Sequence, residues 1–151
     1  MEVRSQMPID LKETKGFIYL GAAPQTDRSN YSIAAPYPTK GKVPFTTSRM
    51  VDSARNAQGT MVGRMVGRSV DKQELGWQTI SPQLWWEMNR WFEDGHFTFY
   101  CHYFSHNLGR WETRMFYLSD VKCSPVNVDA ATGMPEYYED ASFSVVDCGV
   151  I

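Results

Sequence analysis

Apolar and polar residues alternate along several stretches of the chain with the two-residue period of a β-strand. Residues 72–80 place Leu75 and Trp77 on one face, which predicts a half-buried strand. The same pattern predicts strands over 17–20, 97–104, 111–118, 121–128 and 141–146. The residues that we expect on the apolar faces of two of these strands are Phe97, Phe99, Cys101 and Tyr103, and then Phe143 and Val145.

Residues 81–94 have the period of an α-helix instead. Ser81 is a favourable N-cap, Pro82 suits the first helical position, and Gly95 suits the position just after the helix. Trp86 lies off the centre of the apolar stripe, so we expect it at a surface or an interface. The stripe consists of Leu84, Trp85, Met88, Trp91 and Phe92.

Residues 21–48 contain four prolines, which argues against a central strand there and predicts a long loop. Loops of this length are usually functional or become ordered against a partner. Residues 49–59 continue this loop as a polar connector, so that 21–59 is one extended loop and connector. At the other side of the first strand, residues 1–15 are a possible arm. Tyr31, Tyr37 and Phe45 lie in the loop and are expected to be buried on the parent domain or on a neighbour.

A tandem repeat, Met61-Val62-Gly63-Arg64 followed by Met65-Val66-Gly67-Arg68, comes after the connector. Two interior glycines would destabilise a helix by about 1 kcal/mol each relative to alanine. We therefore expect a strand whose glycine face allows another backbone to approach closely.

The count of six or seven strands and one helix predicts a mainly β (α+β) fold. We expect an antiparallel β-sandwich or barrel with one packed helix, and the 151 residues fit a single domain over 1–151. No apolar stretch approaches the roughly 18–20 residues that cross a bilayer, so no membrane partner is expected. The three cysteines are an odd number, which favours free thiols over a disulfide framework.

Charge is segregated along the chain although the net charge is only -2. Residues 1–39 are neutral, residues 40–72 carry seven basic and two acidic residues, and residues 73–151 carry four basic and eleven acidic residues. One interpretation is that both signs are interleaved on the folded surface. The sharper one is a basic edge and an acidic edge that pack head to tail in copies of the chain. Nucleic-acid binding is a third, but the basic strip lacks interleaved aromatics for stacking bases.

No motif for catalysis, phosphate binding or metal binding stands out. The chain has no glycine-rich phosphate loop and no CxxC pair. His96, Cys101, His102 and His106 have poor spacing for a metal site and are interpreted as hairpin residues. We therefore expect no enzyme, no catalytic residue, no metal and no cofactor.

The stretch Ser53-Ala54-Arg55-Asn56-Ala57-Gln58-Gly59-Thr60-Met61-Val62 resembles small tail structural proteins of phages and prophages of Gram-positive hosts. The likeness continues through the strand ending at Ile80, the Ser81-Pro82 helix start, and Phe116-Tyr117 with Asp120, so that it spans about 53–120. It implies a virion structural protein of the tail, tube-like or at the distal end, assembled in the host cytoplasm. Such proteins form rings, commonly hexameric, that contact other tail proteins and let DNA pass through the lumen without specific binding.

The main hypothesis is therefore a ring that forms by head-to-tail self-association. Two alternatives stay open: a carbohydrate- or host-surface-binding module that uses Trp86, Trp111 and tyrosines, and a small hydrolase that uses His102 or nearby acids. The position along the tail and the order of the ring are left open. The candidate subunit-interface residues are Tyr31, Tyr37, Phe45, Arg49, Arg55, Arg64, Arg68 and Trp86.

Overall fold

The computed structural model describes residues 16–49, 51–55, 61–65 and 68–149. In these residues the chain is mostly antiparallel strands with one α-helix and one short 3-10 helix. The elements in chain order are β1 (Ile18–Gly21), η2 (Arg28–Asn30), β2 (Ile33–Ala35), β3 (Phe45–Ser48), β4 (Val51–Arg55), β5 (Met61–Met65), β6 (Val70–Ile80), α1 (Pro82–Glu93), β7 (Thr98–Ser105), β8 (Arg110–Leu118), β9 (Lys122–Val126) and β10 (Tyr137–Asp147). The expected mainly β, α+β class is confirmed.

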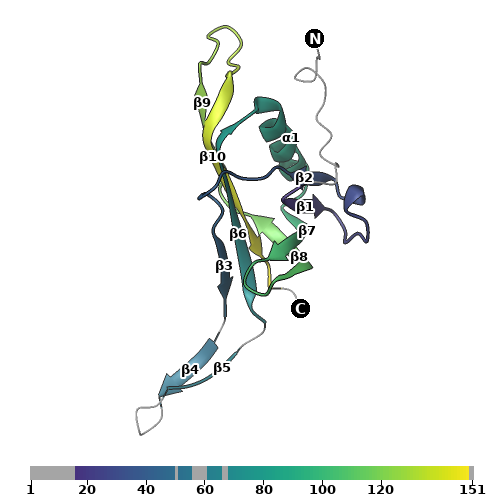
Figure 1. Cartoon of the computed structure of the whole chain (residues 1–151), viewed down its shortest axis with the longest axis vertical. Coiled ribbons are helices and arrows are strands. Elements are labelled where there is room, and N and C mark those ends of the chain that lie inside the picture. Colours follow the sequence, from purple (N-terminus) through teal and green to yellow (C-terminus); the bar gives the residue numbers. More distant parts are fainter. Residues whose placement is uncertain (1–15, 50, 56–60, 66–67, 150–151) are drawn as a thin grey trace.

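Eight strands form one antiparallel sheet (Figure 1). Seven of them follow the order β2-β1-β7-β8-β10-β6-β3, and β9 lies off this path beside β10. The long strand β10 pairs with β6 along its length, and on its other edge with β9 and then with β8. β2 and β3 lie at opposite ends of the order, so the sheet is not a closed barrel. A single core cluster contains residues from β1, β6, β7, β8, β10 and α1, which shows that the sheet curls around it.

The helix α1 begins and ends as predicted. The hydroxyl of Ser81 accepts a hydrogen bond from the Leu84 N–H, and Gly95 has φ +78°, which suits the residue just after a helix. Trp85, Met88 and Phe92 are buried. The Phe92 ring lies 5.5 Å from the Phe143 ring on β10, so the helix closes the core against the long strands.

The alternation that predicted the strands also placed most of the core correctly. Phe99, Cys101 and Tyr103 are buried on β7, and Phe143 and Val145 on β10. The prediction for Phe97 was wrong, because β7 begins one residue later and Phe97 is 75% exposed. Its ring lies on the outer surface, 6.3 Å from the ring of Tyr117.

The proline-containing segment 21–48 is long, as expected, but it has more regular structure than a loop. It contains η2, β2 and β3, and both strands lie at the ends of the main sheet. Proline is tolerated at such edges, which agrees with the expectation that no central strand lies here. Tyr31 is 1% exposed and its ring is 6.2 Å from that of Tyr19, so it packs on its own subunit.

The polar connector predicted over 49–59 is also partly a strand. β4 pairs with β5 in a separate two-stranded sheet, from Val51 opposite Met65 to Arg55 opposite Met61. The repeat was therefore correctly predicted as a strand at residues 61–65. From here on, we call this hairpin the arm; the possible arm predicted over residues 1–15 lies outside the described residues. Figure 1 shows the hairpin projecting from the bottom of the molecule beyond β3 and β6.

Candidate interaction site

The arm is a two-stranded sheet separate from the eight-stranded sheet. A two-stranded hairpin by itself is at best marginally stable in water, and both outer edges of such a ribbon present unpaired backbone groups. Figure 1 shows the arm standing away from the eight-stranded sheet that encloses the core. A structure of this kind gains stability when its edges and faces meet a second surface.

A buried ionic network lies where the arm joins the body. We call it the root cluster; its members are Arg68, Asp71, Tyr103, Arg114 and Asp147. Arg68, between β5 and β6, donates to both carboxylate oxygens of Asp147 at 2.5 and 2.7 Å. Arg114 on β8 lies 3.3 Å from Asp147 and 3.5 Å from Asp71. The Tyr103 hydroxyl donates to Asp71 at 2.5 Å.

The root cluster binds both strands that lead into the arm. Asp71 and Arg68 belong to the β6 side, and on the β3 side Thr47 donates its hydroxyl hydrogen to Asp71 at 2.8 Å. The side chain of Asn107, in the turn between β7 and β8, donates to Thr47 at 2.8 Å. Side-chain contacts therefore join the ends of β3 and β6 nearest the arm to β7, β8, β10 and the turn between β7 and β8.

Burial and hydrogen bonding shift the pKa of the Asp147 carboxyl group in opposite directions. Burial alone would raise the pKa of this carboxyl group, but hydrogen bonds from Arg68 and from the Gly149 N–H outweigh it, so the pKa is lower than usual. The hydrogen bond to Asp147 raises the pKa of the Arg68 guanidinium. Burial, followed by the hydrogen bond to Asp71, raises the pKa of Tyr103. Asp147 and Arg68 thus form a charged pair, and Tyr103 remains a neutral donor.

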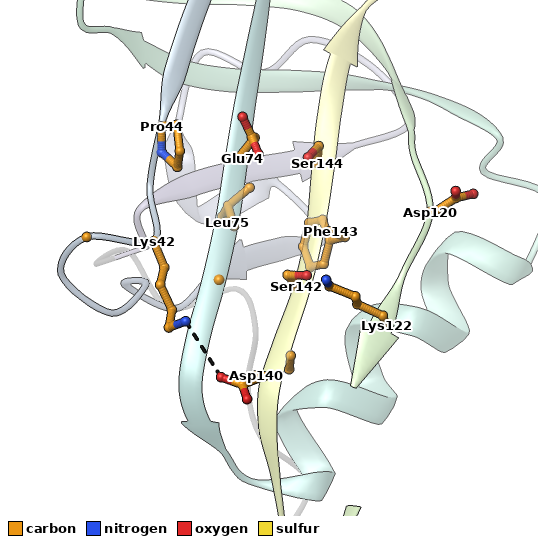
Figure 2. A pocket seen from close by; sticks show the side chains of 13 residues that line it. Lys42, Pro44, Glu74, Leu75, Asp120, Lys122, Asp140, Ser142, Phe143 and Ser144 are labelled. Carbon is orange, nitrogen blue, oxygen red and sulfur yellow. Dashed lines mark ion pairs between the residues drawn. The ribbon is translucent and has the colours of Figure 1, made fainter. Parts of the chain in front are cut away.

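A shallow groove of about 670 Å³ crosses the outer face of β6 and β10 (Figure 2). Lys42 and Lys122 reach over it from opposite sides, and the floor includes Glu74 on β6 and Ser142 on β10. Lys42 lies 3.6 Å from Asp140, which has φ +49° where the pairing of β10 with β9 shifts by one residue. The groove offers charges of both signs and hydroxyl groups, so it suits a polar surface better than an apolar ligand.

Two of the eight predicted interface residues make contacts within their own chain instead. Tyr31 is buried against Tyr19, and Arg68 is bound to Asp147 in the root cluster. Both side chains therefore have partners within the subunit, and their place in a contact between subunits stays a prediction.

The other six predicted interface residues are distributed over the surface and the arm. Phe45 packs partly against the core, with its ring 6.1 Å from that of Tyr103. Tyr37 is 67% exposed, and Arg49 is exposed close to the arm. Arg55 and Arg64 belong to β4 and β5, and their side chains lie outside the described residues.

Trp86, the last of the predicted contacts, is half-buried and not free on the surface. Its indole N–H donates to the Tyr138 hydroxyl at 2.9 Å and so joins the helix to β10. The aromatic residues named for a binding module or a hydrolase also have contacts. The His102 ring stacks on Trp111 at 4.9 Å, and the Arg28 guanidinium lies 4.2 Å from the Trp111 ring. Burial, with Arg28 nearby, lowers the pKa of His102.

Sequence reasoning did not anticipate the root cluster, although a signal for it was present. Asp71, Arg114 and Asp147 all fall at the core-facing parity of their strands, in line with Leu75, Phe116 and Val145. Charges of opposite sign at apolar positions of different strands are consistent with a buried, paired network. The alternation of side chains along a strand does not indicate which strands lie side by side.

Comparison with protein family models, with curated protein sequences and with solved structures gives no match to this chain. In the ranges that the structure describes, no group of three or more His, Cys, Asp or Glu side chains is arranged to hold a metal ion. Within the same ranges, α1 and the other helical segment are too short or too polar to span a bilayer.

Proposed function

We propose that the protein is a structural subunit of a phage tail that associates head to tail with copies of itself to form a ring. The observation that carries the proposal is the arm, a separate two-stranded sheet that stands away from the core. An unsupported ribbon of this kind is marginal alone and becomes stable on a neighbour. The resemblance of residues 53–120 to tail proteins supplies the virion location and the other tail proteins as partners.

The form of association that we propose is a head-to-tail contact between the arm of one copy and the body of the next. The arm lies at one end of the molecule, and the eight-stranded body that would receive it lies elsewhere (Figure 1). When one surface binds a different surface of the next copy, the contact repeats and closes into a ring or extends into a filament. Repetition around a ring also sums contacts that are individually weak.

The root cluster is consistent with the proposal because it holds the ends of β3 and β6 that lie nearest the arm. Two residues of the basic stretch, Lys42 and Arg68, pair with Asp140 and Asp147 of their own chain.

The proposal is tested by shortening the arm. Residues 50–67 are replaced by Asn-Gly, which retains Arg68 and closes β3 and β6 with a short turn. We expect the shortened chain to unfold with the same cooperativity as the full chain in urea, because the core and the root cluster remain. Analytical ultracentrifugation should find it monomeric at concentrations where the full chain assembles. Assembly of equal extent in both chains would refute the role of the arm.

A further inference from the structure

The groove across the outer face of β6 and β10 belongs to the body of the molecule and has no part in the proposed ring contact (Figure 2). Its volume of about 670 Å³ lies within the range of about 300–1,000 Å³ that is usual for small-ligand sites. All of its lining residues belong to the part of the chain that the structure describes. A depression of this size can hold a small molecule.

The floor of the groove is low because its central residues are small. Gly76 on β6, Ser142 on β10 and Lys122 on β9 lie side by side in the paired strands. A Cβ atom at position 76 would lie only 3.0 Å from the Cβ of Lys42, so glycine allows the Lys42 side chain to cross β6. The Thr39 N–H donates to the Gly76 carbonyl at 2.8 Å and holds this segment beside β6. The paired backbone therefore keeps the shape of the groove before any ligand binds.

One wall of the groove is an exposed ion pair. The Lys42 ammonium lies 3.6 Å from the Asp140 carboxylate, and the two side chains are 42% and 69% exposed. An ion pair this exposed is weak, so either group can exchange its partner for a ligand at little cost. Asp140 also has φ +49°, a conformation that is uncommon for residues with a side chain and is often found at binding sites.

Other polar groups that line the groove are free to bind a ligand. The side chains of Glu74, Lys122, Ser142 and Ser144 make no hydrogen bond or ion pair with another described residue. They include a carboxylate that accepts hydrogen bonds, an ammonium that donates them, and two hydroxyl groups that do both. A few polar groups that converge on a preformed hollow are the usual means by which a site orients its ligand.

The charges around the groove select the class of ligand. Two lysines line it together with three carboxylates, which belong to Glu74, Asp120 and Asp140. A polyanion would meet the carboxylates and a polycation would meet the lysines, and like charges in contact disfavour binding. A hydroxyl group both donates and accepts, so a neutral ligand rich in hydroxyl groups can satisfy the lysines and the carboxylates together.

We propose that this groove binds a neutral oligosaccharide, whose hydroxyl groups donate to Glu74 and Asp140 and accept from Lys122. The site differs from the aromatic residues that the sequence offered for such a module. Trp86 and Trp111 already contact other residues of the chain. The inference goes beyond the proposed ring and does not rest on it, because no residue of the arm lines the groove.

The first experiment tests the class of ligand. Saturation-transfer NMR with the full chain screens a panel of neutral di- and trisaccharides of glucose, galactose, mannose, rhamnose and N-acetylglucosamine. We expect at least one member to bind with a dissociation constant of about 1 mM or lower, measured by isothermal titration calorimetry. Sulfated and amino forms of that sugar should bind more weakly. Failure of the whole panel, or tighter binding of a charged form, would overturn the proposal.

The second experiment places the sugar in the groove. Lys122→Met removes a free donor, Ser142→Phe fills the floor, and Lys72→Met is the matched control because Lys72 is exposed on β6 outside the groove. We expect Lys122→Met to raise the dissociation constant about tenfold and Ser142→Phe to abolish binding. Lys72→Met should bind as wild type does. Urea unfolding shows whether each variant is folded, and Lys122→Met decides the matter if Ser142→Phe does not fold.

The outcomes separate this inference from the proposed function. The chain with the shortened arm should bind the sugar with wild-type affinity, and loss of binding in it would overturn the groove as the site. Unchanged affinity in Lys122→Met and Ser142→Phe would overturn it as well. A full chain that is monomeric throughout but binds the sugar in the groove would refute the ring and support this inference.

Discussion

Arg68 and Asp147 are separated by 79 positions in the sequence, yet their side chains form two parallel hydrogen bonds of 2.5 and 2.7 Å. Asp147 is the last residue of β10 and its side chain is fully buried, whereas Arg68 lies at the base of the arm with 23% of its side chain exposed. The pair therefore connects the final strand of the body to the segment from which the arm leaves.

Loss of this pair should destabilise the whole subunit. Arg68→Ala leaves the buried Asp147 carboxylate with Arg114 at 3.3 Å and the backbone N–H groups of Asp71 and Gly149 as partners. Removing one partner of a buried pair commonly destabilises by 3–5 kcal/mol, and the partial exposure of Arg68 reduces our expectation to about 2–3 kcal/mol. Urea unfolding measures the free energy.

Arg110→Ala is the matched control for that experiment. Its side chain is 64% exposed and lies 3.6 Å from Glu112, so the expected loss is below about 1 kcal/mol. Equal stability of Arg68→Ala and the wild type would show that the root cluster contributes nothing to the stability of the subunit.

Stability should fall in acid because of Asp147. Its pKa is lower in the folded chain than the ordinary value of 3.8, so the folded state binds this proton less readily than the unfolded state. The contribution of the ionised Asp147 carboxylate to the free energy of unfolding is complete at pH values above the ordinary pKa. It is lost as the pH falls through the pKa of the folded state. Between pH 5 and 2, Asp147→Asn should show a weaker dependence of unfolding free energy on pH than Asp120→Asn, which changes an exposed carboxylate. An identical pH dependence of the unfolding free energy in the two variants would contradict the lowered pKa of Asp147.

The hydrogen bond between Trp86 and Tyr138 should stabilise the attachment of α1 to β10. Trp86→Phe and Tyr138→Phe each remove one partner of the 2.9 Å bond, and each should lower the free energy of unfolding by about 0.5–1.5 kcal/mol. In a double-mutant cycle the two losses should be less than additive, because the second change removes a bond that is already absent. Strict additivity would mean that the two side chains do not interact.

The three cysteines should differ in their reactivity with a thiol reagent. Cys123 is exposed on β9, Cys148 is partly buried, and Cys101 is fully buried, with its pKa raised well above the usual value by that burial. Reaction rates should therefore decrease in the order Cys123, Cys148 and Cys101. Mass spectrometry of the labelled peptides measures them. Rapid labelling of Cys101 in the folded chain would be incompatible with its place in the core.

Sequence patterns predicted the parts of the fold that depend on local chemistry. The stripe around Trp85 and Met88, with Ser81 and Gly95 at its ends, has the features of a helix in any context. The alternation through Phe143 and Val145 predicts a strand with one buried face wherever that strand pairs.

Features that depend on long-range pairing could not be predicted in this way. The edge strands β2 and β3 are short and surrounded by prolines, so their own residues carry only a weak strand signal. Burial of Tyr31 was expected on the parent domain or on a neighbour, and nothing local indicated that Tyr19 would lie beside it. The partner of Arg68 is contributed by the last strand, and neither residue's local sequence specifies the other.

Mass measured by light scattering over a concentration series, at low and high salt, tests the central claim of self-association most directly. The account predicts a species several times the 17.3 kDa of one chain at low salt. We expect it to dissociate as salt rises, because the arm that would make the contact includes arginines. A mass of 17.3 kDa at every concentration and salt would contradict it.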